Sequence, residues 1–143
     1  MEDDTIKLLR ECNAGIKMGI SSLEDVIDEV TDEKLKKILK NSKEAHCKLG
    51  DETHELLTQY HDDGKEPAMM AQVMSKVKTN VKLMKENVNT TVADLITDGC
   101  DMGIKSLYKY LNQYKAASDK VKNLVTRVLT EEEHLEKELR SFL

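Results

Sequence analysis

The chain reads LLRECNAGIKMGISSL at residues 8–23 and TDGCDMGIKSLYKYL at residues 97–111. The two stretches match at a shift of 88 positions, which pairs Cys12, Gly15, Ile16 and Lys17 with Cys100, Gly103, Ile104 and Lys105. A second match follows, because residues 32–39, DEKLKKIL, align with residues 118–125, SDKVKNLV, at a shift of 86. We interpret the chain as a duplicated helical hairpin with a long connector between the two copies.

The composition of the 143-residue chain favours helices over strands. It includes one proline, six glycines, no tryptophan and 34% charged residues. Such residues build long amphipathic helices, whereas strands need more aromatic and β-branched side chains and more turns. We therefore predict a single all-α domain, large enough to bury a core of its own.

Apolar residues recur at alternating steps of three and four, which is typical of helices packed in a bundle. In the opening helix these positions are Ile6, Leu9, Asn13, Ile16, Ile20, Leu23, Ile27 and Val30, so that only Asn13 interrupts the apolar face. The second helix is predicted to bury Leu35, Ile38, Ser42, Ala45, Leu49, Glu52 and Leu56. The last helix is predicted to bury Val121, Leu124, Val128, Glu131, Leu135, Glu138 and Phe142.

Turn residues divide the domain into three segments. Asp62, Asp63 and Gly64 precede Pro67, which suits the first turn of a new helix. We expect one hairpin at residues 3–62, a crossover helix at 67–88 and a second hairpin at 90–143, whose first helix follows Asn89-Thr90-Thr91. A helix of about 20 residues rises about 30 Å, so a crossover of this length can return the chain to its starting end.

The two hairpins, with their C-x-x-G-I-K segments at Cys12 to Lys17 and Cys100 to Lys105, resemble a bacterial ferritin-like family of short cytoplasmic four-helix-bundle proteins. The resemblance extends over nearly the whole chain. It implies a ferritin-like four-helix bundle of two hairpins joined by a helical crossover and related by a pseudo-two-fold axis. The family has no settled activity, so the resemblance implies none. In this fold we expect Gly15 and Gly103 to allow close helix packing, so that Gly15→Leu would destabilise it.

Ferritin-like bundles raise the question of a di-iron site. Such a site takes a carboxylate from each of two helices and a Glu-x-x-His pair from each of the other two. Glu131 and His134 have this spacing in the last helix, but the second helix has Lys43 three residues before His46. Because the ligand set is incomplete, we expect no di-iron centre.

Two interpretations of the acidic last helix stay open. The favoured one is a solvated helix end, because Glu132, Glu133 and Glu136 crowd the same turns. The alternative is a degenerate or partial metal site formed by Asp101, Glu131, His134 and Glu138. Asn13, which matches Asp101 in the other copy, more simply sets the register of a bundle core. No other cofactor is expected.

Charge and hydropathy exclude several classes of function. A net charge of −5 provides no positive field to attract nucleic acid. The N-terminus lacks the basic region of a signal peptide, and no apolar run approaches the length of a membrane span. Three cysteines without CxxC spacing fit reduced thiols better than disulfides. We therefore expect a cytoplasmic protein without nucleic-acid or membrane partners.

The motifs favour a binding or structural protein over an enzyme. We find no nucleophile with an adjacent base, no glycine-rich phosphate loop and no HExxH. His46 with Lys48 and Gly50 faintly resembles a histidine phosphotransfer site, but the lysine stands one position too early. The predicted crossover helix has apolar residues on more than one side, namely Met70, Met74, Val77, Val81 and Met84 on one face and Met69, Val73 and Leu83 away from it. We therefore expect a homodimer that uses this helix.

Overall fold

The computed structural model describes residues 2–62 and 87–143, and they form four long helices. These helices are α1 at Glu2–Ile27, α2 at Glu33–Gln59, α4 at Val88–Gln113 and α5 at Asp119–Leu139. A short 3-10 helix, η1, follows at Arg140–Phe142. No strand occurs within the two described ranges, so the predicted all-α class is confirmed. No helix in these ranges has the length and apolarity that crossing a membrane requires.

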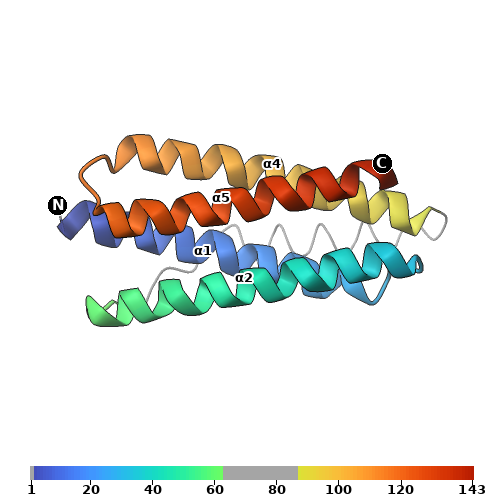
Figure 1. Cartoon of the computed structure of the whole chain (residues 1–143), viewed down its shortest axis with the longest axis horizontal. Helices are drawn as coiled ribbons and strands as arrows, with labels where there is room; N and C mark the ends of the chain where they lie inside the picture. Colours follow the sequence, from blue (N-terminus) through green and yellow to red (C-terminus); the bar gives the residue numbers. More distant parts are fainter. Residues whose placement is uncertain (1, 63–86) are drawn as a thin grey trace.

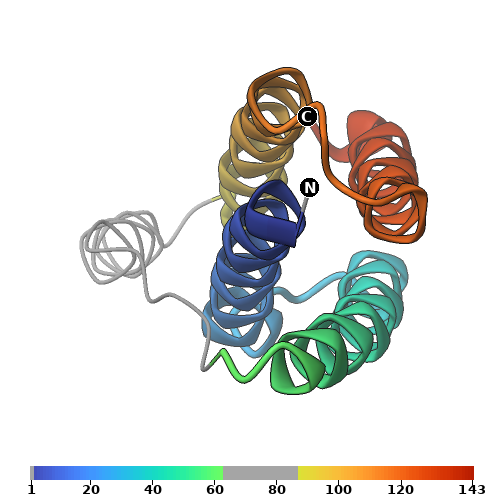
Figure 2. The same ribbon diagram turned by 90° about the vertical axis from the view of Figure 1, so that its left-hand side faces the viewer.

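The four helices form a bundle of two antiparallel hairpins (Figure 1). α1 packs on α2 and α4 packs on α5, and the hairpins meet where α2 contacts α5 and α1 contacts α4. The end-on view places the four helices at the corners of a rough square (Figure 2). α2 finishes at one end of the bundle and α4 starts at the other, so these two helices run in the same direction (Figure 1).

Part of the predicted connector lies outside the described residues. The crossover helix was expected at residues 67–88, and of these the structure describes only 87 and 88. The methionine-rich faces on which the homodimer prediction rests, including Met69, Met70, Val73 and Met74, also lie outside the described residues. The dimer interface therefore stays a prediction.

Each turn between paired helices is bound by the first turn of the other hairpin. Asn89 Oδ1 at the start of α4 accepts hydrogen bonds from the backbone N–H groups of Thr31 and Asp32 at 2.9 and 3.3 Å. At the other end of the bundle, Thr5 Oγ1 in α1 accepts from the backbone N–H of Ser118 at 2.8 Å. The sequence predicts that this helix starts after Asn89-Thr90-Thr91, but α4 begins at Val88. Asn89 therefore lies in the first turn of α4, where its side chain bonds to the opposite hairpin.

The N-terminal caps of α2 and α5 repeat at the spacing of the sequence match. Asp32 accepts from the backbone N–H of Leu35 at 2.8 Å, and Ser118 accepts from that of Val121 at 3.3 Å. Both pairs satisfy a helix N–H that has no partner within its own helix. The two residues that begin these helices in the sequence alignment are thus also their capping residues.

The apolar core consists of two clusters along the bundle axis. One cluster lies toward the α1–α2 turn and includes Leu23, Val26, Val30, Leu35, Leu39, Val92, Ile96, Cys100, Leu135 and Leu139. The other lies toward the α4–α5 turn and includes Leu8, Leu9, Cys12, Ile16, Leu49, Leu57, Val121, Leu124, Val125, Val128 and Leu129. On α2, Ser42 and His46 fall between the contributions to the two clusters. On α5, Glu131 and Glu132 do the same.

The predicted buried face of α2 is wrong in its second half. The structure buries His46, Thr53 and Leu57, whereas Glu52 is exposed and Ala45 and Leu56 are only partly buried. The prediction alternated steps of three and four, which averages 3.5 residues per turn. A straight helix has 3.6 residues per turn, so its buried face moves ahead of that pattern by about one position over this length. For the same reason α5 buries Leu139 and exposes Glu138.

The predicted packing role of Gly15 is also wrong. Gly15 is exposed, and a β-carbon added there would have no other heavy atom within 4 Å. Close packing occurs instead at Gly19, where an added β-carbon would lie 3.1 Å from His46 Cδ2, and at Gly50, where it would lie 3.2 Å from Ile16 Cγ2. The glycines that permit close approach are therefore outside the repeated C-x-x-G motif.

Candidate functional site: a polar layer inside the bundle

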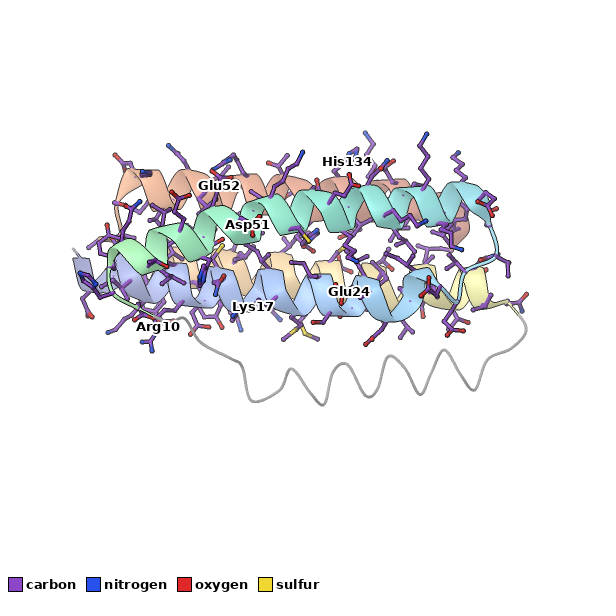
Figure 3. The ribbon with its side chains drawn as sticks, turned by 90° about the horizontal axis from the view of Figure 1, so that it is seen from below. Arg10, Lys17, Glu24, Asp51, Glu52 and His134 are labelled. Carbon is purple, nitrogen blue, oxygen red and sulfur yellow. The ribbon has the colours of Figure 1, made fainter. Side chains whose placement is uncertain are left out.

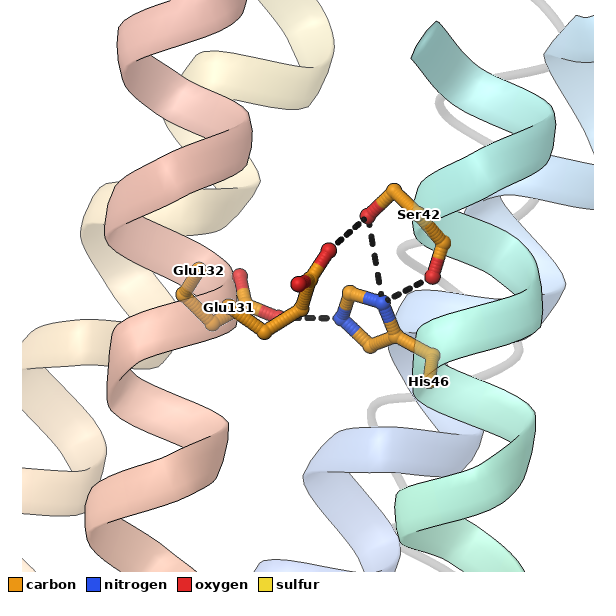
Figure 4. A network of polar contacts seen from close by, with 4 residues as sticks. All are labelled: Ser42, His46, Glu131 and Glu132. Atoms are coloured by element: carbon orange, nitrogen blue, oxygen red, sulfur yellow. Dashed lines mark hydrogen bonds and ion pairs between the residues drawn. The ribbon is translucent and has the colours of Figure 1, made fainter. Parts of the chain in front are cut away.

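The interior of the bundle contains a hydrogen-bonded network of four polar side chains on α2 and α5 (Figure 4). His46 Nε2 lies 2.5 Å from Glu132 Oε1, and His46 Nδ1 lies 2.8 Å from the backbone oxygen of Ser42. Ser42 Oγ donates to Glu131 Oε1 at 2.9 Å. The network joins the two hairpins in the layer between the two apolar clusters.

The geometry fixes the position of the protons on His46. A backbone oxygen only accepts hydrogen bonds, so His46 Nδ1 carries a proton and donates it to Ser42. The contact between Nε2 and the Glu132 carboxyl oxygen then requires one further proton between these two atoms. Either the imidazole is charged and faces a carboxylate, or it is neutral and accepts from a carboxylic acid.

The surroundings of His46 shift its pKa in opposite directions. Burial is the largest influence and lowers the pKa, because it disfavours the charged imidazolium. The hydrogen bond to Glu132 and its negative charge raise the pKa, and the Ser42 carbonyl and the charge of Glu131 add to them. The raising influences together exceed the effect of burial, so the pKa of His46 lies above its ordinary value. This favours the imidazolium–carboxylate form.

The imidazole of His46 is closed to solvent, and the carboxyl groups of Glu131 and Glu132 are partly buried. The His46 side chain is 1% exposed and that of Glu132 is 13% exposed. α1 covers the imidazole with Gly19, the position at which an added β-carbon would come within 3.1 Å of the ring. On α4, Cys100 lies next to Glu132: burial first, and then the charge and hydrogen bond of Glu132, raise the pKa of its thiol far above the ordinary value. All four helices therefore contribute to the enclosure.

The structure separates the four metal ligands that the sequence suggested. Glu131 faces the interior and accepts a hydrogen bond from Ser42. His134 and Glu138 pair with each other on the surface at 2.8 Å, with side chains 61% and 38% exposed. Asp101 is exposed, and its hydrogen bond to Glu136 is the main cause of the raised pKa of that glutamate. Within residues 2–62 and 87–143, no group of three or more His, Cys, Asp or Glu side chains is arranged to hold a metal ion.

The sequence missed the partner of His46. Glu132 appeared to be a solvated helix-end residue, since its neighbours Glu133 and Glu136 are also acidic. One signal was available, because His46 and Glu132 are 86 positions apart, the shift that relates the second helices of the two hairpins. Two residues that correspond in the sequence repeat can meet on antiparallel helices only near the two-fold axis that relates the repeats. The spacing of 86 therefore marked His46 and Glu132 as a pair that could lie in contact.

Charged residues elsewhere lie along the outside of the bundle (Figure 3). Arg127 forms two hydrogen bonds with the carboxylate of Glu52, at 2.9 and 2.8 Å, between α5 and α2. An open groove of about 700 Å³ is lined by α1 and α2 and includes Cys47, with Lys43 3.4 Å from Glu24. Since both acidic and basic side chains line this groove, it does not select a ligand of one charge.

No protein-family model matches the chain, and no curated protein or solved structure matches it either. The ferritin-like family therefore stays a resemblance, carried by the sequence motifs alone.

Proposed function

We propose that the chain is a cytoplasmic, ferritin-like helical bundle that acts as a non-catalytic structural or binding protein. The observation that carries the proposal is the polar layer, in which the convergent interior side chains satisfy one another. His46 uses both ring nitrogens, and Ser42 Oγ is bonded to Glu131. A catalytic site needs groups that can reach a substrate, whereas His46 is buried and both of its ring nitrogens are already paired.

The arrangement of the helices supports the ferritin-like part of the proposal. The chain enters α4 at the opposite end of the bundle from the end of α2, as two hairpins joined by a lengthwise crossover require. The caps Asp32 and Ser118 are 86 positions apart, as are His46 and Glu132. A pseudo-two-fold axis that passes between His46 and Glu132 explains both spacings.

The cysteines support a non-catalytic role in a reducing compartment. Cys12, Cys47 and Cys100 are free thiols. Burial raises the pKa of Cys12 to about 12, and the pKa of Cys100 is raised as well. Both buried thiols are therefore protonated at neutral pH, the form in which cysteine is neither a nucleophile nor a metal ligand.

A second candidate function is metal binding by a degenerate interior site. It is favoured by the presence of His46, Glu131 and Glu132 in one layer, since imidazole and carboxylate are the ligand types of ferritin-like metal sites, but the three side chains would have to rearrange to share an ion. A cation would have to displace the proton between His46 and Glu132 and separate the two atoms, because ligand bonds of about 2.0 Å on one ion cannot span only 2.5 Å at tetrahedral geometry.

Elemental analysis of protein purified without chelators separates the two candidates. A non-catalytic structural or binding protein should contain substoichiometric metal and show no saturable Fe(II) or Zn(II) binding. About two irons per chain together with rapid Fe(II) oxidation would contradict it and also the expected lack of a di-iron centre. The control is His46→Gln, which removes the imidazole ligand: metal retained by this variant would belong to surface groups such as His134 and Glu138.

We also propose self-association as a homodimer through the predicted crossover helix. The support is the sequence pattern of residues 69–84, which lies outside the described residues. Analytical ultracentrifugation at micromolar concentration tests it. A monomer whose sedimentation is unchanged by Met69→Glu and Val73→Glu would refute the dimer.

A further inference from the structure

The contact between His46 and Glu132 depends on one proton. His46 Nδ1 already donates to the Ser42 carbonyl at 2.8 Å, so only the proton on the Nε2 side can be lost without breaking that bond. When it is lost, the lone pair of Nε2 faces a carboxylate oxygen at 2.5 Å. Two acceptors at this distance repel each other, so the contact must open.

Opening this contact breaks an interaction that joins the two hairpins. His46 belongs to α2 and Glu132 to α5, the helix pair through which the α1–α2 and α4–α5 hairpins meet on this side of the bundle. The Glu132 side chain is 13% exposed, and Cys100 and Gly103 of α4 lie beside it. Relief of the repulsion therefore requires α2 and α5 to separate, the carboxylate to turn toward solvent or water to enter the layer, and each of these breaks the contact between the hairpins.

We propose that the His46–Glu132 contact is a pH-sensitive switch between the two hairpins, closed when the shared proton is bound and opened when it is lost at alkaline pH. This inference does not depend on the bundle being ferritin-like, but it rests on the proposed metal-free layer, because a bound cation would displace the shared proton. It also depends on the enclosure of the pair and on the proton count at His46.

The groups that face the pair come from each helix around it. α5 presents the carboxyl groups of Glu132 and Glu131, both of which favour the imidazolium. α4 presents Cys100, whose thiol is hydrogen-bonded to Glu132. α1 presents Gly19, which has no ionisable group. On α2 itself, the Ser42 carbonyl and hydroxyl complete the layer. The charged groups that raise the pKa of His46 are thus the two carboxylates, Glu131 and Glu132.

The sign of the pH dependence follows from the raised pKa of His46. The folded chain binds the proton more tightly than the unfolded chain, so the stabilisation is complete below the ordinary histidine pKa of about 6.5. It is lost as the pH rises from that value through the raised pKa of the folded state. Within this window the folding equilibrium constant falls by up to about tenfold per pH unit for one proton.

The first experiment compares urea unfolding of the wild type and Glu132→Gln between about pH 6 and pH 8, a range set by the ordinary histidine pKa. Glutamine keeps the shape of the side chain, and its amide can donate to a neutral imidazole, so this variant needs no shared proton. We expect the wild-type equilibrium constant to fall with pH and that of Glu132→Gln to change much less. Cys12 and Cys100, whose pKa values are also raised by folding, contribute little in this range, because the ordinary cysteine pKa is about 8.5.

Glu133→Gln is the matched control, because it removes the same charge from the adjacent, exposed position. It should retain the wild-type slope. Equal slopes for the wild type and Glu132→Gln would overturn the proposal.

A second measurement keeps the proposal testable if Glu132→Gln does not fold. The ring nitrogens of His46 can be followed by NMR in the wild type. We expect His46 to remain an imidazolium above the ordinary histidine pKa of about 6.5. Loss of the His46 proton at or below that pH would refute the switch.

Discussion

Removing one member of the His46–Glu132 pair should destabilise the fold more than removing both. His46→Leu leaves the Glu132 carboxylate 13% exposed and without its cation, and breaking a buried charge pair in this way costs about 3 to 5 kcal/mol. Glu132→Leu leaves Nε2 without a partner inside the bundle, which costs about 1 to 3 kcal/mol. The double variant has neither unpaired group and joins the two apolar clusters, so we expect its stability to be close to that of the wild type.

Urea unfolding followed by far-ultraviolet circular dichroism measures the cycle, since the chain contains no tryptophan. We expect a coupling free energy of at least about 2 kcal/mol, at the upper end of the range for residues in contact. The control cycle uses His134→Leu and Glu138→Leu, an equivalent pair whose side chains are 61% and 38% exposed. Its coupling should be no more than about 0.5 kcal/mol. Additive effects at His46 and Glu132 would show that the buried pair is not coupled and would refute the reasoning.

A reciprocal exchange tests the proposed pseudo-two-fold axis through the same pair. Because the axis would relate position 46 to position 132, His46→Glu combined with Glu132→His should rebuild the contact in the opposite direction. The double exchange should be more stable than His46→Glu alone, which places a third carboxylate beside Glu131 and Glu132. If the exchange is no more stable than that single variant, the two positions are not equivalent.

Four further predictions concern other positions. Gly19→Ala should destabilise by about 1 to 3 kcal/mol, because the new methyl meets a His46 ring that two hydrogen bonds hold in place. Gly15→Ala should stabilise by about 0.5 to 1 kcal/mol, since that exposed helix position is open and alanine favours the helix, and the opposite order in thermal unfolding would contradict both expectations. Asp32→Ala should cost about 1 kcal/mol through loss of the α2 cap, with Asp32→Asn as the control that keeps it. Arg127→Ala should change the unfolding free energy by less than about 1 kcal/mol, because its pair with Glu52 is half exposed, and a larger loss would show that the pair does more than join two surface side chains.

The helices of this protein follow from the sequence. Their periodicity and the sparse glycine and proline residues predict the four long helices, because these signals act within a few residues of one another. The buried face was predicted less well. The structure buries Thr53 and Leu57, one position beyond the predicted Glu52 and Leu56. This difference accumulates over about seven turns of the helix, and no local signal in the sequence corrects it.

The polar layer was decided by tertiary structure alone. Glu132 is one of several glutamates in a row, and nothing within α5 distinguishes it from Glu133. It differs only because the antiparallel packing of α2 and α5 brings it to His46, 86 positions away, where Gly19 of α1 leaves room for the ring. The sequence by itself determined which segments are helical, since that depends on neighbouring residues. Which charged side chain becomes buried depends on how four helices pack around a common axis, and that information is not local to any one of them.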